Sequence, residues 1–185
     1  MLAIVFAMAS PAFAGSIKGT VHLGKAAEAE GTIVYIESVP EHAFTASPTV
    51  ARLSQKGALF SPAVLPIVRG SQVDMSNDDW VSHNAFSRSA VKTFDLGLYA
   101  QDARRMVTFD NVGVVPVFCA IHPRMTAVIL VLQNPFFARP APDGRFSLDD
   151  VPPGTYQLKV YRPGAPATAG VTVKVPASGS VPAQF

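Results

Sequence analysis

Four side chains in this sequence form a set suited to holding a metal ion. Cys119, His122 and Met125 follow one another at C-x2-H-x2-M spacing, so a tight loop between two strands would aim a thiolate, an imidazole and a thioether at one point. With a second imidazole, these are the ligands of a mononuclear blue-copper site. His83, in the segment SHNAFS, is the candidate for that second imidazole. The spacing therefore predicts one copper ion held by His83, Cys119, His122 and Met125.

The same residues allow simpler interpretations. A cysteine beside a phenylalanine in a strand is often a buried packing residue. Zinc also binds cysteine and histidine, but it prefers several such ligands and makes little use of a thioether. Beyond His83 and His122 only His22 and His42 remain, too few imidazoles for the additional copper centres of a multicopper oxidase or a copper nitrite reductase. We therefore expect copper rather than zinc, and a protein that is not an enzyme.

Composition narrows the class of protein further. The chain has 185 residues, of which 15% are charged and 49% hydrophobic, which excludes a disordered chain. A net charge of +2 without a run of Lys or Arg argues against nucleic-acid binding. The one cysteine excludes an internal disulfide. The aromatic residues Trp80, Phe86, Phe94 and Tyr99 are expected to fill a core.

Residues 1–14 have the pattern of a secretory signal peptide. Residues 2–9 are apolar and uncharged, and Ala12-Phe13-Ala14 gives the small-x-small pattern before a cleavage point at Gly15. No Lys or Arg precedes the apolar run, which leaves the true start of the signal open. The run is shorter than the roughly 20 apolar residues that span a bilayer. We therefore expect a periplasmic protein without membrane insertion after signal cleavage.

Sixteen prolines, thirteen glycines and short alternating segments predict an all-β chain. Strands are expected over 16–23, 32–36, 65–69, 72–75, 105–109, 114–118, 127–132, 145–148, 155–161 and 171–175. The last three have one apolar face each and need a partner sheet to bury it, for which the first two are the obvious partners. We expect a small β-sandwich from residues 15–50 and 140–176, a copper domain over 52–134 inserted into it, and a tail over 177–185. One continuous larger sandwich is the alternative.

Short motifs along the chain occur in the same order in one family of copper proteins. They are Gln55-Lys56, Phe60-Ser61-Pro62, Asn77-Asp78, His83-Asn84, Phe86-Ser87, Phe94 to Tyr99, Val107-Thr108-Phe109, Gly113-Val114-Val115, and Cys119, His122 and Met125. On these motifs residues 53–134 resemble a cupredoxin, most closely the bacterial cupredoxin-like proteins labelled methylamine utilisation proteins. The flanking segments Gly144-Arg145-Phe146 and Val151 to Tyr156 are similar to carboxypeptidase-regulatory or transthyretin-like sandwiches. The resemblance implies a cupredoxin Greek-key β-sandwich, inserted in or packed on a small transthyretin-like β-sandwich.

The resemblance also implies roles for single residues. His83, Cys119 and His122 would be equatorial ligands of one type 1 copper ion, and Met125 the axial ligand. Asn84 would bind no metal itself but would tie the two ligand loops together near the thiolate. The sequence departs from the family at Tyr161-Arg162-Pro163, where several relatives have an aromatic residue, a histidine and a proline. This departure puts any second metal site in doubt.

The resulting functional hypothesis is a type 1 (blue) copper protein of the periplasm. It would carry single electrons between redox protein partners, through the exposed edge of His122. Two alternatives stay open. One is a copper carrier or storage protein that uses the same ligands. The other is a non-redox interaction module whose metal site is vestigial.

Overall fold

The computed structural model describes residues 14–165 and 169–185, and nearly all of their regular secondary structure is β-strand. The short helix α1 (Glu28–Gly31) stands between the first two strands. In chain order the strands are β1 (Ala14–Thr20), β2 (Ile33–Ile36), β3 (Ala51–Lys56), β4 (Leu59–Ser61), β5 (Val64–Val68), β6 (Ser71–Asn77), β7 (His83–Arg88), β8 (Thr93–Tyr99), β9 (Arg104–Phe109), β10 (Gly113–Phe118), β11 (Thr126–Leu132), β12 (Phe137–Ala138), β13 (Arg145–Val151), β14 (Gly154–Tyr161), β15 (Val171–Val175) and β16 (Ser178–Gln184). The expected all-β architecture is confirmed.

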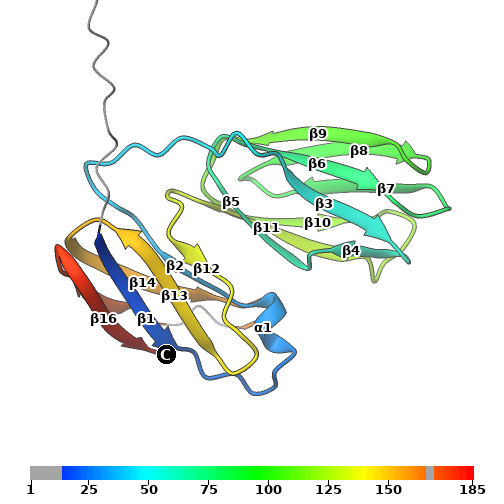
Figure 1. Cartoon of the computed structure of the whole chain (residues 1–185). Helices are drawn as coiled ribbons and strands as arrows, with labels where there is room; N and C mark the ends of the chain where they lie inside the picture. The colour runs from blue at the N-terminus through cyan, green and yellow to red at the C-terminus, as the bar shows by residue number, and fades with distance from the viewer. Residues whose placement is uncertain (1–13, 166–168) are drawn as a thin grey trace, which may run out of the picture.

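Two sheets built from both ends of the chain form a small sandwich (Figure 1). One sheet has the strand order β13-β1-β16, and the other β12-β2-β14-β15. Alternation explains the packing: Tyr156, Leu158 and Val160 of β14 are buried, while the residues between them point outward or are half-buried. Ile17 of β1 faces them from the opposite sheet, and both sets belong to one hydrophobic cluster. This sandwich therefore needs strands that are far apart in sequence.

Residues 51–132 form a second sandwich with its own core. Its sheets have the strand orders β4-β3-β6-β9 and β5-β11-β10-β7-β8. Leu53, Met75, Phe109 and Ile129 from both sheets are fully buried in one cluster. The pairs β3–β6 and β5–β11 are parallel, whereas β6–β9, β7–β8 and β10–β11 are antiparallel. The strands β7, β10 and β11 position the residues singled out by the sequence.

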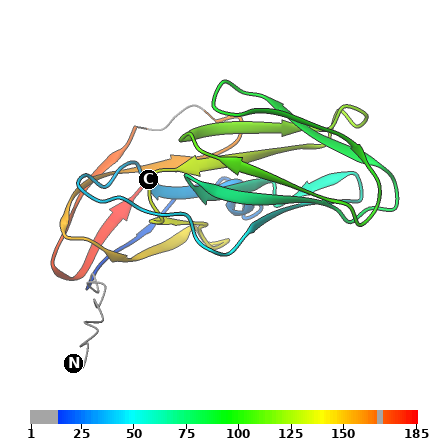
Figure 2. The ribbon, with the colours of Figure 1, turned by 90° about the horizontal axis from the view of Figure 1, so that it is seen from above.

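The two sandwiches lie side by side and share a small apolar contact (Figure 2). Ile33 of β2 packs in one cluster with Val64, Leu130 and Leu132 of the second sandwich. Polar contacts add to this junction, since the guanidinium of Arg139 donates a hydrogen bond of 2.7 Å to the carbonyl of Val64. No helix among residues 14–165 and 169–185 is long and apolar enough to cross a bilayer.

The chain end differs from the expectation of a tail. Residues 178–184 form strand β16, which pairs in parallel with β1 from Ala14↔Ser178 to Thr20↔Gln184. The segment has no run of β-branched residues and contains Pro182, which is why its sequence does not read as a strand. As an edge strand it tolerates a proline, because one of its sides makes no sheet hydrogen bonds. The small sandwich therefore extends past residue 176. The expected signal peptide over 1–14 lies, except for Ala14, outside the described residues.

Candidate metal centre

Three strands of one sheet deliver the candidate ligands. His83 is the first residue of β7, Cys119 follows the last residue of β10, and residues 119–125 connect β10 to β11. The connection is closed by its own backbone: the amide of Met125 donates to the carbonyl of His122 at 2.9 Å, and the amide of Cys119 donates to the carbonyl of Met125 at 3.2 Å. These bonds fold the C-x2-H-x2-M segment into a tight loop beside the start of β7.

The structure brings His83, Cys119 and His122 together. Their ligand atoms all lie within 4.8 Å of one another. The two Nδ1 atoms of His83 and His122 are 3.1 Å apart, and the Sγ of Cys119 lies 3.8 Å from the Nδ1 of His122. His83 is fully buried, and Cys119 is 4% exposed. Met125 is also fully buried and belongs to the same hydrophobic cluster as Cys119.

The arrangement fits a single metal ion. Two nitrogens and a sulfur bound to one ion at 2.0–2.3 Å in a trigonal plane lie about 3.5–4 Å apart. The observed separations, from 3.1 Å up to 4.8 Å, bracket that range. The Nε2 of His83 lies 3.0 Å from a carboxylate oxygen of Asp79. An ionised carboxylate only accepts hydrogen bonds. A hydrogen bond between the two groups therefore requires the proton on Nε2, which would leave a lone pair on Nδ1.

Asn84 makes hydrogen bonds in two directions beside the candidate ligands. Its Oδ1 accepts a hydrogen bond of 2.6 Å from the amide of Ala120, and its Nδ2 donates to Asp95 at 3.2 Å. Asn84 is 4% exposed and follows His83 directly. One side chain thus joins the strand of the first candidate ligand to the loop of the others. The roles of these residues as ligands and as a link between ligand loops stay predictions.

Two polar residues at this site, Asn77 and Asp79, were not among the site residues predicted from the sequence. Asp79 contacts His83, as described above. Asn77 donates to the carbonyls of Val81 at 2.8 Å and Tyr99 at 3.0 Å, and so folds the segment 78–82 that precedes His83. The motif Asn77-Asp78-Asp79 reads as a turn in the sequence. Its usable signal is an acidic residue four positions before a candidate histidine ligand, since carboxylates commonly orient such histidines.

The carboxyl group of Asp79 stays ionised over a wide pH range. Its pKa is lowered to about 2, first by the hydrogen bond from the amide of Ala58 and next by the hydrogen bond with His83. The amide of Trp80 also donates to it, at 3.0 Å. A negative charge therefore sits against the buried face of the candidate metal centre.

The aromatic residues do not all fill the core as expected. Tyr99 is 3% exposed, and Phe94 packs against the core of the second sandwich. Trp80 is 83% exposed, which corrects the expectation for this residue. The reason is local: the segment 78–82 turns so that Asp79 points inward, and the adjacent side chain must point outward. Phe86 is half-buried and contacts Phe118, with ring centroids 5.8 Å apart.

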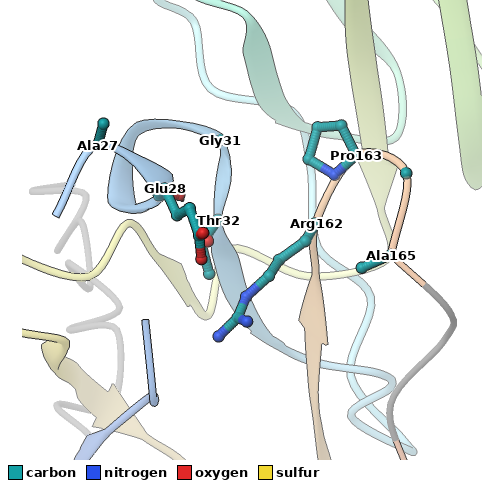
Figure 3. A pocket seen from close by; sticks show the side chains of 8 residues that line it. Ala27, Glu28, Gly31, Thr32, Arg162, Pro163 and Ala165 are labelled. Carbon is teal, nitrogen blue, oxygen red and sulfur yellow. The ribbon is translucent and has the colours of Figure 1, made fainter. Parts of the chain in front are cut away.

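The small sandwich has a pocket of about 450 Å³ whose polar side chains include an acid and a guanidinium, unlike the candidate metal centre (Figure 3). It lies between α1 and the segment that follows β14, and Arg162 extends beside Glu28 and Thr32. The guanidinium of Arg162 donates to the backbone carbonyl of His22 at 2.5 Å. Among the described residues, the only group of three or more metal-ligating side chains is His83, Cys119 and His122. This pocket therefore offers no second group of that kind.

Comparison with known protein families gives one match. The family model described as polysaccharide lyase family 4, domain II, matches residues 132–181. These residues run from the end of β11 through β12–β15 into β16. They include residues 140–176 of the small sandwich expected to resemble carboxypeptidase-regulatory domains, but none of its residues 15–50, and that resemblance stays a prediction. No curated protein matches the chain.

Solved structures similar to this chain include several copper proteins. A purple cupredoxin from Nitrosopumilus maritimus is 26% identical, with a TM-score of 0.41, over 44% of this chain and 98% of its own. A mutant of amicyanin in its Cu(I) form is 16% identical, with a TM-score of 0.43, over 51% of this chain and 96% of its own. A copper-containing nitrite reductase from Thermus scotoductus SA-01 is 23% identical, with a TM-score of 0.45, over 63% of this chain. The chain spans 28% of that enzyme's length. Cupredoxins are thus structural neighbours of this chain, which has a His–Cys–His group of its own.

Proposed function

We propose that this chain binds one type 1 copper ion and carries single electrons between protein partners in the periplasm. His83, Cys119 and His122 would be the equatorial ligands, and Met125 the axial ligand. The observation that carries the proposal is the group of one thiol and two imidazoles whose ligand atoms lie within 4.8 Å of one another. The burial of Met125 in the same hydrophobic cluster as Cys119 supports a thioether as the fourth ligand.

The chemistry of the ligand set favours copper. One thiolate, two imidazoles and a weak thioether suit copper in a trigonal site, whereas a zinc site of this size would hold further Cys or His ligands. A bound copper ion would supply one-electron chemistry, since it is stable both as Cu(I) and as Cu(II). With three equatorial positions taken by protein, no equatorial position is left for a substrate. The site is therefore suited to electron transfer and not to catalysis.

The loop structure supports a rigid site. The backbone bonds within 119–125 and the bond from Ala120 to Asn84 fix the loop that carries Cys119 and His122. The carboxylate of Asp79 fixes the ring of His83. Little movement is then needed when the charge of a bound ion changes. Such preorganisation favours fast electron transfer, because the protein does not have to rearrange at each step.

His122 offers a route for electrons to the surface. It is half-buried and lines a pocket of about 480 Å³ together with Ala58, Leu59, Pro123 and Arg124. Leu59 is 60% exposed, and the neighbouring Ile121 is 49% exposed. An apolar surface with few charges suits the small, short-lived interfaces of redox partners. We propose that a redox protein docks here, with Arg124 at the border favouring an acidic partner.

The test is to add Cu(II) to the purified protein and record visible and electron paramagnetic resonance spectra. An intense blue thiolate-to-copper band with a narrow copper hyperfine splitting is expected, and Cys119→Ser should lack both. His42→Ala is the matched control, because this exposed histidine lies outside the group and its loss should leave both signals unchanged. A colourless wild-type protein would contradict the copper site and favour an interaction module.

A second measurement separates an electron carrier from a copper carrier. The loaded protein is reduced and reoxidised in the presence of a competing chelator. An electron carrier keeps its copper and returns to the same spectrum over many cycles. Rapid transfer of copper to the chelator would contradict electron transfer and support a role in copper delivery or storage.

A further inference from the structure

The loop before β7 places a carboxylate directly against the first candidate ligand. The Oδ2 of Asp79 lies 3.0 Å from the Nε2 of His83, and the two side chains are 5% and 0% exposed. The two Nδ1 atoms of His83 and His122 meet on the other side of the ring. The imidazole of His83 thus stands between a buried anion and the candidate metal centre.

Asp79 is itself held from several sides. Its Oδ2 also accepts from the amide of Ala58 at 2.9 Å, and its Oδ1 accepts from the amide of Trp80 at 3.0 Å. Its own amide donates to the Oδ1 of Asn77 at 3.0 Å. Ala58 lies in the turn between β3 and β4 with φ of 54°. The carboxylate therefore cannot turn away from His83 without breaking contacts in two separate segments.

This arrangement has two consequences for His83. A carboxylate accepts hydrogen bonds and donates none when ionised, so it selects the ring form with the proton on Nε2 and a lone pair on Nδ1. It also makes the ring a stronger electron donor, because the anion stabilises positive charge on the imidazole. A more basic ligand and a nearby negative charge both favour an ion of higher charge.

We propose that Asp79 is a positioning residue of the metal centre, which fixes the tautomer of His83 and favours Cu(II) over Cu(I), lowering the reduction potential. The second half of this proposal rests on the copper site proposed above. The first half does not, because it concerns only the contact between Asp79 and His83. In a simpler alternative, Asp79 only stabilises the turn by accepting hydrogen bonds from the amides of Ala58 and Trp80, and its contact with His83 has no effect on the ring. The experiment separates the two.

Asp79→Asn is the test variant, because it removes the charge at nearly constant shape. Asp78→Asn is the matched control. Its carboxylate is the neighbour in sequence and bonds to Arg52, Ser54 and Ser76, none of which is a candidate ligand. Both variants lose one negative charge, but only Asp79→Asn replaces the ionised acceptor beside His83 with an amide, which can accept from or donate to the ring.

The first readout uses the metal-free protein. Long-range ¹H–¹⁵N correlation spectra report which ring nitrogen of the neutral His83 carries the proton. We expect Nε2–H in the wild type and in Asp78→Asn, and a mixture of tautomers in Asp79→Asn. A wild-type ring with its proton on Nδ1 overturns the proposal without any variant, so a variant that fails to fold does not leave the question open.

The second readout uses the copper-loaded protein. Changes in groups that orient a metal ligand typically cost 10–100-fold in metal affinity. We expect Asp79→Asn to weaken Cu(II) binding at least tenfold more than Cu(I) binding, which raises the reduction potential by about 59 mV for a tenfold change. Asp78→Asn should change the ratio of Cu(II) affinity to Cu(I) affinity less than threefold. Equal shifts in both variants would mean a general charge effect and overturn the role of the contact, as would no shift in Asp79→Asn. A wild type that binds no copper overturns the proposed function and the preference for Cu(II), while the tautomer result still decides the positioning role.

Discussion

The link between the ligand loops through Asn84 can be tested by truncation. Asn84→Ala removes the hydrogen bond of 2.6 Å from the amide of Ala120 and the bond of 3.2 Å to Asp95. A neutral hydrogen bond contributes about 0.5–1.5 kcal/mol net, and a buried donor left without a partner costs about 1–3 kcal/mol. Ala120 is exposed, so water reaches its amide once Asn84 is gone. The lower figures therefore apply, about 0.5–1.5 kcal/mol for local opening of the loop.

Amide hydrogen exchange measures this opening at one atom. A loss of about 0.5–1.5 kcal/mol corresponds to roughly 2- to 12-fold faster exchange at Ala120. The amide of Val117, within the β10–β11 ladder, should exchange at the wild-type rate. Asn111→Ala is the control, since Asn111 makes a side-chain bond to Val91 outside the ligand loop. Unchanged exchange at Ala120 in Asn84→Ala would refute the reasoning.

Three further predictions concern stability and charge. Leu130→Ala, at the junction of the two sandwiches, should destabilise the protein by about 2–5 kcal/mol in urea unfolding, because it leaves a cavity in the shared cluster. Gly144→Ala should cost more than about 1–2 kcal/mol, because φ is +84° and a Cβ would lie 2.3 Å from the carbonyl oxygen of Val21. Asp78 should titrate below 3.8 in carboxyl NMR, since the hydroxyl of Ser54 above all lowers its pKa. The stability it contributes is present above its unfolded pKa and is lost as pH falls through the folded value.

Each of these predictions has a matched control. Leu98→Ala, at a side chain 62% exposed, should stay within about 0.5 kcal/mol of the wild type. Gly57→Ala also has a positive φ but meets nothing within 4 Å, so it should cost less than Gly144→Ala. Ser54→Ala should raise the pKa of Asp78 toward 3.8. A pKa of Asp78 that does not move, or equal costs for the two glycine variants, would contradict the corresponding argument.

Local patterns in the sequence were enough to predict most of the strands and the loop that holds three of the candidate ligands. Alternating residues such as those of 155–161 and 171–175 predict strands with one apolar face, because side chains along a strand point to opposite sides. The loop 119–125 was also within reach, since C-x2-H-x2-M places three ligand types on one short connection. Both patterns involve residues only a few positions apart, and the geometry of the backbone limits how such residues can be arranged relative to one another.

Only the tertiary structure decided which distant residues meet. His83 and His122 are 39 positions apart, and their contact depends on β7 and β10 lying in the same sheet. Asp79 reads as a turn residue until folding brings the amide of Ala58, 21 positions away, to its carboxylate. Residues 178–184 become a strand only because β1 offers an edge to pair with. In each case the energy comes from contacts between segments far apart in the chain, and no local pattern records those contacts.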